Sequence, residues 1–158
     1  MKLFDISNSL NGDGSILLLS HKPHQMGLNG INAKIFSRPD VLRVCSAGDD
    51  QAICCCDIRL KSENSRLEAA IFCSHSIPGA ALSALRGIHW LSDNHILATG
   101  YDQRLSVWQL LPTVRETAIV YTDVGDVNSL AYIRQRGGHS LAAVVGAGVE
   151  LFSLRDEN

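Results

Sequence analysis

The chain has 158 residues, of which 46% are hydrophobic and 19% charged, and its 14 Lys and Arg against 16 Asp and Glu give a formal charge of −2. This composition is typical of a globular domain with a core, and it excludes a disordered chain. The slightly acidic balance argues against a stand-alone nucleic-acid binder, because such domains carry an excess of basic residues.

The first segment, "MKLFDISNSLNGDG", becomes polar too early for a signal peptide. No apolar run in the chain reaches the roughly 18 residues that cross a bilayer. We therefore expect a cytoplasmic protein without a membrane span.

The same first segment opens a pattern that recurs along the chain. "MKLFDI" is followed by "AICCCDI", "LSVWQL" and "VELFSL", and the matching positions are Phe4, Cys56, Trp108 and Phe152. Their spacings of 52, 52 and 44 residues lie close to the roughly 40–45 residues of a WD repeat. The period predicts four copies of one β-rich unit.

The surroundings of each copy repeat as well. An apolar strand and an acidic turn precede the second and third copies ("VLRVCSAGDDQ" and "HILATGYDQ"), and another apolar strand follows the first three ("SILLLSH", "LEAAIFCSH" and "TAIVYTD"). Alternating apolar residues are typical of strands with one face against a neighbour. We expect two strands in 1–21, four in 28–73, four in 82–121 and three in 127–154.

The five cysteines include the adjacent run Cys54 to Cys56. An odd number of cysteines suits a reducing compartment better than a disulfide framework. Adjacent strand residues point to opposite faces, so only Cys54 and Cys56 share a side, and no paired C-x-x-C motif follows. The pattern favours buried thiols, and we expect neither a metal site nor a cofactor.

Marker residues within the units resemble those of WD-repeat propellers. In such repeats a His before the first strand, an Asp between the second and third strands and a Trp on the third form a structural hydrogen-bonded network. His24 with Asp50 matches the first two markers, and Asp102 with Trp108 matches the last two. Elsewhere Cys56 replaces the Trp, Asp123 takes the place of the His in the last unit, and the turn before Val149 has no Asp.

The resemblance implies an all-β fold, namely an incomplete WD-repeat β-propeller. It would form about three C-terminal blades of a longer toroid, because a propeller protects its edge strands by closing. The implied blades are 1–23 (the end of one blade), 24–74, 75–122 and 123–158, and the last lacks its outer strand. Missing blades would precede Met1.

A closer resemblance extends over most of the chain. The motifs "HQMGLNGI", "DQRLSVWQL", "YTDVGDVNSL" and "GGHSLAAVVGAGVELFSLRD" occur in the order in which they stand in the WD repeat-containing protein six family. That family is the auxiliary, non-catalytic subunit of a tRNA ribose 2'-O-methyltransferase. The resemblance implies that this chain binds the catalytic subunit and helps to place a tRNA anticodon loop for methylation of the wobble ribose, with tRNA contacted through the complex.

Two readings of function remain open: this methyltransferase subunit, and a WD-repeat scaffold in an unrelated signalling or trafficking complex. The histidines show no partner at a catalytic spacing, so we expect no enzyme. The short basic run "RQRGGH" from Arg134 is the one local cluster that could meet phosphate, although a solvated loop tip is the simpler interpretation. Propeller loops gather on one face, and the partner surface would there include Gln25, Asp49, Tyr101 and Asp102.

Overall fold

The computed structural model describes residues 1–5, 15–35, 38–63, 66–134 and 139–155, and these form strands and turns without a helix. The strands are β1 (Lys2–Asp5), β2 (Ile16–Ser20), β3 (Leu28–Ile35), β4 (Val41–Gly48), β5 (Ile53–Glu63), β6 (Arg66–Ile77), β7 (Leu85–Trp90), β8 (His95–Gly100), β9 (Arg104–Gln109), β10 (Arg115–Tyr121), β11 (Ser129–Arg134), β12 (His139–Val145) and β13 (Val149–Arg155). The predicted all-β class is confirmed.

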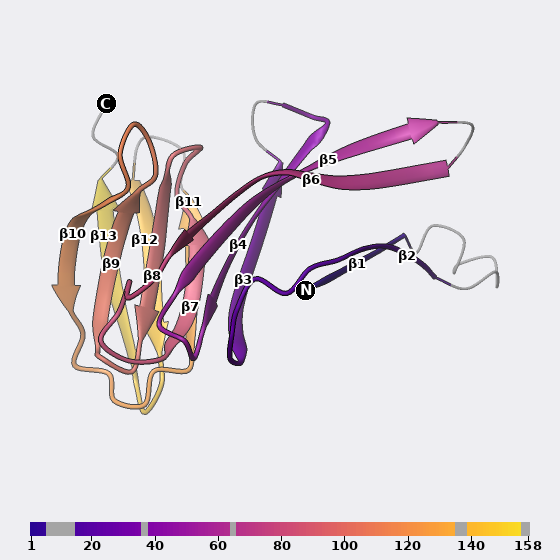
Figure 1. Ribbon diagram of the computed structural model, residues 1–158. Coiled ribbons are helices and arrows are strands. Elements are labelled where there is room, and N and C mark those ends of the chain that lie inside the picture. Colours follow the sequence, from indigo (N-terminus) through magenta and orange to yellow (C-terminus); the bar gives the residue numbers. More distant parts are fainter. Residues whose placement is uncertain (6–14, 36–37, 64–65, 135–138, 156–158) are drawn as a thin grey trace.

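Each sheet is an antiparallel meander in which neighbours in sequence pair with each other. The sheets have the orders β1-β2, β3-β4-β5-β6, β7-β8-β9-β10 and β11-β12-β13. Among the described residues this is the predicted grouping of two, four, four and three strands. The strands β5 and β6 run longer than their counterparts β9 and β10, and they extend as a hairpin beyond the rest of their sheet (Figure 1).

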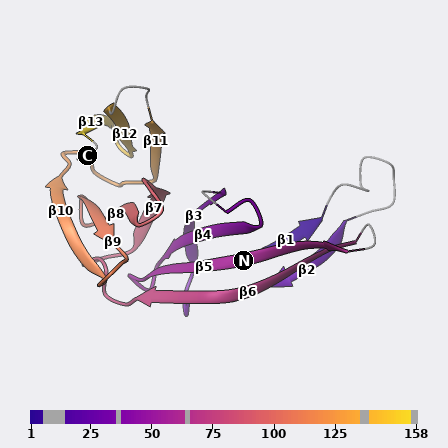
Figure 2. The same cartoon turned by 90° about the horizontal axis from the view of Figure 1, so that it is seen from above.

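The sheets follow one another along a curved row, as the view from above shows (Figure 2). The first strands lie innermost: β7 contacts β3 on one side and β11 on the other. At the outside of the row, β2 contacts β6. This arrangement is compatible with a propeller, in which sheets pack face to face around an axis.

Alternation along each strand supplies apolar side chains to both faces of a sheet. In β5, Ile53 and Cys55 pack against β7–β10 in a cluster that contains Trp90. Cys56 and Ile58 point the other way and pack with residues of β1 and β2. The sheets β7–β10 and β11–β13 share a third cluster, which includes Leu105. The strand β5 is therefore apolar on both faces, as packing between two neighbouring sheets requires.

Gly87 sets the distance between two inner strands. A Cβ at this position in β7 would collide with Leu130 Cβ in β11 and lie 2.9 Å from the Leu130 backbone nitrogen. Only a residue without a side chain lets the two backbones approach this closely.

We expect Gly87→Ala to lower the free energy of unfolding by about 1–3 kcal/mol, because the added methyl forces β7 and β11 apart. Urea unfolding followed by circular dichroism measures the change. Gly148→Ala is the matched control, since a Cβ there has no atom within 4 Å. Equal losses in the two variants would contradict the role of the close approach.

His89 joins the same two strands. Its Nε2 lies 3.1 Å from the Leu130 carbonyl oxygen, and because a carbonyl only accepts, this nitrogen donates. The ring also lies against that of Tyr132, with centroids 6.3 Å apart. Burial lowers the pKa of His89, the bond to Leu130 raises it, Lys34 lowers it, and the net direction is downward.

Protonation of His89 at low pH is therefore expected to lower the free energy of unfolding. Because its folded pKa is depressed, the unfolded chain binds more protons once the pH drops below the unfolded value of about 6.5, so stability falls from there downward. His89→Gln keeps a donor but does not titrate, and it should show a shallower loss of unfolding free energy between about pH 7.5 and about pH 5.5. His139→Gln, at an exposed position, is the control; identical pH profiles for wild type and His89→Gln would refute this assignment.

Candidate functional site

His24 lies buried at the entry to β3, at the centre of a polar network. Its Nδ1 is 2.9 Å from Asp50 Oδ1, and its Nε2 is 2.9 Å from Ser46 Oγ. The second carboxylate oxygen of Asp50 accepts the backbone N–H of Gln25 at 2.9 Å. Since the carboxylate only accepts, Nδ1 carries a proton, and in the neutral ring Nε2 accepts the Ser46 hydroxyl. The structure thus brings the predicted pair together and adds Ser46.

These donors favour the charged form of Asp50. Burial raises the pKa of its carboxyl, while the hydrogen bonds from His24 and from the backbone of Gln25 lower it, and the net direction is downward. The carboxylate form is therefore the one that holds the loop before β3 against the turn between β4 and β5.

In the next sheet the turn carboxylate is kept but the histidine is not. Asp102 Oδ2 accepts the N–H of Leu82 at 2.9 Å, which is the bond that Gln25 makes to Asp50. Ala81 therefore stands at the position of His24. Trp108 donates from Nε1 to Ser106 Oγ at 3.0 Å, and it packs against the cluster between the first two four-stranded sheets. Asp102 and Trp108 therefore use different partners.

The last sheet corrects one assignment made from the sequence. Asp123 was placed at the histidine position, but that position holds Thr122, whose Oγ1 donates to Glu150 Oε2 at 2.6 Å. The N–H of Asp123 donates to the same oxygen at 3.0 Å. Glu150, at the start of β13, thereby replaces the turn aspartate. The sequence pattern does not predict the role of Glu150, because the turn is shorter here and the carboxylate lies in β13 instead of in the turn.

The turns also bind the loops that lead to the following sheet. Gln51 and Gln103 have positive φ values of 62° and 56°, which fit the tight turns they occupy. The carbonyl of Gln51 accepts the N–H of Ala80 at 2.9 Å, and that of Gln103 accepts the N–H of Thr122 at 2.9 Å. The loop surface at this end of the sheets is therefore one connected hydrogen-bonded layer.

The residues predicted to form the partner surface lie in this layer. Gln25 is exposed and Asp49 half-buried, and Asp49 Oδ1 accepts from Asn29 Nδ2 at 2.7 Å. Tyr101 is exposed, its hydroxyl accepts from Arg86 Nη2 at 2.6 Å, and the Arg86 guanidinium lies 4.2 Å from its ring centroid. Asp102 is the half-buried neighbour of Tyr101.

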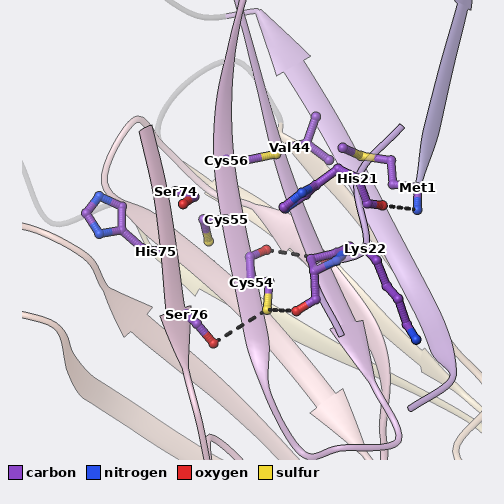
Figure 3. Close-up of a pocket in the computed structure, with 12 residues that line it drawn as sticks. Met1, His21, Lys22, Val44, Cys54, Cys55, Cys56, Ser74, His75 and Ser76 are labelled. Carbon is purple, nitrogen blue, oxygen red and sulfur yellow. Dashed lines mark hydrogen bonds between the residues drawn. The ribbon is translucent and has the colours of Figure 1, made fainter. Parts of the chain in front are cut away.

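A cavity of about 310 Å³ lies between residues 21–23 and the strands β4, β5 and β6 (Figure 3). Its wall includes Cys54 and Cys56, and Cys54 Sγ lies 3.2 Å from the Pro23 carbonyl oxygen and 3.6 Å from Ser76 Oγ. Burial, followed by the neighbouring Asp57, raises the pKa of Cys56 to about 11. Burial also raises the pKa of Cys54. Protonated thiols are weak nucleophiles.

In the described part of the chain, no group of three or more His, Cys, Asp and Glu side chains is arranged to hold a metal ion. Nor does this part contain a helix that could cross a membrane. The basic run from Arg134 continues into residues 135–138, which lie outside the described residues.

Comparison with known proteins gives a structural likeness but no family. No family model matches, and no curated protein matches. Among solved structures, the chain is similar to a chain in a humanized mutant of the Chaetomium thermophilum Polycomb Repressive Complex 2 bound to the inhibitor GSK126, with a TM-score of 0.59 and 13% identity. The match covers 89% of this chain and 31% of that chain. At this identity the likeness shows the fold alone, and this chain spans under a third of its neighbour's length.

Removing the Asp50 carboxylate should destabilise the fold. We expect Asp50→Ala to lower the free energy of unfolding by about 1–3 kcal/mol, because His24 and the N–H of Gln25 lose their acceptor in a mostly buried place. Since the folded pKa of Asp50 is depressed, its contribution is present above the unfolded value of about 3.9 and is lost as the pH falls through the folded value. Urea unfolding between about pH 7 and about pH 3 measures both effects.

Asp123→Ala is the matched control, since the Asp123 side chain is exposed and its role in the Glu150 contact uses the backbone N–H. If the two alanine variants unfold with the same free energy, Asp50 does not hold the loop.

Proposed function

We propose that this chain is a non-catalytic WD-repeat platform that binds other macromolecules through the loops at one end of its sheets. The connected layer of loops and turns supports this proposal, because a surface fixed by backbone bonds can bind a partner without first becoming ordered. The neutral thiols of the cavity and the absence of a three-residue metal cluster in the described ranges supply no alternative centre of chemistry.

The proposal includes a larger ring, of which these sheets are part. Apolar side chains are exposed on the outward face of the sheet β11–β13, namely Ile133, Leu141, Val149 and Leu151. At the other end of the row, Phe4 and Leu17 of the β1–β2 pair are exposed as well. Further blades packed on these two faces would bury them, as closure of a WD-repeat propeller does. We therefore regard these sheets as about three blades of a longer toroid.

The partner we propose is the catalytic subunit of a tRNA ribose 2'-O-methyltransferase. The observation that carries this choice is the order of four motifs along the chain, from "HQMGLNGI" near residue 24 to "VELFSL" near residue 152. They stand in the same order as in the WD repeat-containing protein six family, which this chain resembles. In this role the chain positions the methyltransferase for methylation of the wobble nucleotide, and tRNA is reached through the complex. A scaffold in a signalling or trafficking complex is the alternative outcome of the test below.

Affinity purification of the tagged gene product from its own cells should recover a ribose 2'-O-methyltransferase, identified by mass spectrometry. Deleting the gene should abolish the 2'-O-methyl group at the wobble position of the tRNAs that normally carry it, as measured by mass spectrometry of tRNA nucleosides. Re-expression should restore the methyl group. Unchanged wobble methylation in the deletion strain would rule out the methyltransferase role, and recovery of trafficking or signalling proteins instead would favour the alternative.

A further inference from the structure

Two large apolar side chains protrude from the loop layer. Leu82, before β7, is 78% exposed, and Met26, before β3, is 64% exposed. The backbone at or next to each is held by a hydrogen bond: the N–H of Leu82 donates to Asp102 Oδ2, and the carbonyl oxygen of Gly27 accepts the N–H of Asp49. Exposed leucine and methionine held on rigid backbone are typical anchors for a partner protein.

Hydrogen bonds link the loops that carry these two side chains. Asn29 Nδ2 donates to Asp49 Oδ1 and, at 2.9 Å, to the Leu85 carbonyl oxygen, which connects the first four-stranded sheet to the second. The carbonyl of Ala84 then accepts the N–H of Tyr101 at 3.1 Å. We define the loop patch as Met26, Asp49, Leu82, Tyr101 and Asp102.

Acidic residues predominate in the surrounding loops. The loop and turn segments at this end, with the first two residues of β13, are 21–27, 49–52, 78–84, 101–103, 122–128 and 146–150. Their acidic residues are Asp49, Asp50, Asp102, Asp123, Asp126 and Glu150, whereas Lys22 is their single lysine or arginine. Of the arginines that follow these segments closely in sequence, Arg86 is engaged with Tyr101 and Arg104 pairs with Glu116. Such a surface repels the phosphates of RNA and attracts cationic side chains.

We infer that the loop patch binds a basic, apolar segment of a partner protein, in which leucine-like side chains meet Leu82 and Met26 and flanking lysines or arginines meet Asp49 and Asp102. This inference rests on the proposed role as a binding platform and specifies the chemistry of its partner. It also assigns RNA to another surface of the assembly. The hydrogen-bonded layer fixes the shape of the loop patch before the partner binds. Burial of Leu82 and Met26 then supplies the affinity, and the carboxylates of Asp49 and Asp102 supply the specificity.

Fluorescence anisotropy tests this with three probes: a labelled peptide of alternating lysine and leucine, its glutamate–leucine counterpart, and bulk tRNA. The lysine–leucine peptide should bind the whole chain, and added salt should weaken the binding. Leu82→Ser should weaken it roughly tenfold, since the buried leucine contact is lost. The double variant Asp49→Asn, Asp102→Asn keeps one acceptor oxygen at each position but loses two charges, and it should weaken binding about two- to fivefold and flatten the salt dependence.

Matched controls lie away from the patch. Leu111→Ser changes another exposed leucine, in the β9–β10 loop at the opposite end of the sheet, and Glu68→Gln removes an exposed charge from β6. Both should bind as wild type does. Leu82 has an exposed side chain, so its variant should fold, and urea unfolding verifies this for every protein used.

The inference is overturned if Leu82→Ser binds the peptide as tightly as Leu111→Ser does, which would place the peptide on an uncovered sheet face. Equal affinity for the glutamate–leucine peptide, or equal affinity of the chain for labelled bulk tRNA alone, would overturn it too. No methyltransferase is present in this assay. A negative result in the peptide assay therefore does not test the methyltransferase proposal. A negative result in the deletion and purification experiment, in turn, does not test the chemistry of the loop patch.

Discussion

In all three larger sheets, a carboxylate at or just after the turn between the second and third strands accepts a backbone N–H from the loop that enters the first strand. Asp50, Asp102 and Glu150 make this bond to residues 25, 82 and 123, over 20 positions or more in sequence. Charged acceptors make stronger hydrogen bonds than neutral ones. The bond fixes the entry loop of each sheet, and through that loop it fixes the position of the inner strand.

The row of sheets depends on those inner strands. With the loops fixed, β7 lies between β3 and β11, close enough that Gly87 has no room for a side chain beside Leu130. Each central sheet is then covered on both faces, which explains why β5 alternates between two apolar clusters instead of between core and solvent. The three adjacent thiols follow from the same constraint. Cysteine is small and apolar enough to fill either face, and burial keeps Cys54 and Cys56 protonated.

The same bonds fix the backbone of the loop layer. The chemistry of this surface is set by the charges of the carboxylates that accept them. A carboxylate that accepts a backbone N–H still carries its charge, so the residues that hold the fold also make this end acidic. Asp102 does both, because it anchors Leu82 and stands beside the exposed leucine side chain. In the binding role that we propose, structural and recognition roles coincide in this layer.

The sequence by itself determined the strands and their grouping, because the repeat spacing and the alternation within each copy are local properties of the chain. The pairing of His24 with Asp50 was expected from the resemblance to WD repeats, and the structure brings the two side chains together. It did not determine that Ser46 completes the pair, that Thr122 rather than Asp123 stands at the histidine position, or that Glu150 supplies the missing carboxylate. Those partners lie far apart in sequence and on different strands. Only the packing of one sheet, with a shortened turn that shifts the carboxylate into β13, decided which oxygen reaches which N–H, since a hydrogen bond requires donor and acceptor within about 3 Å.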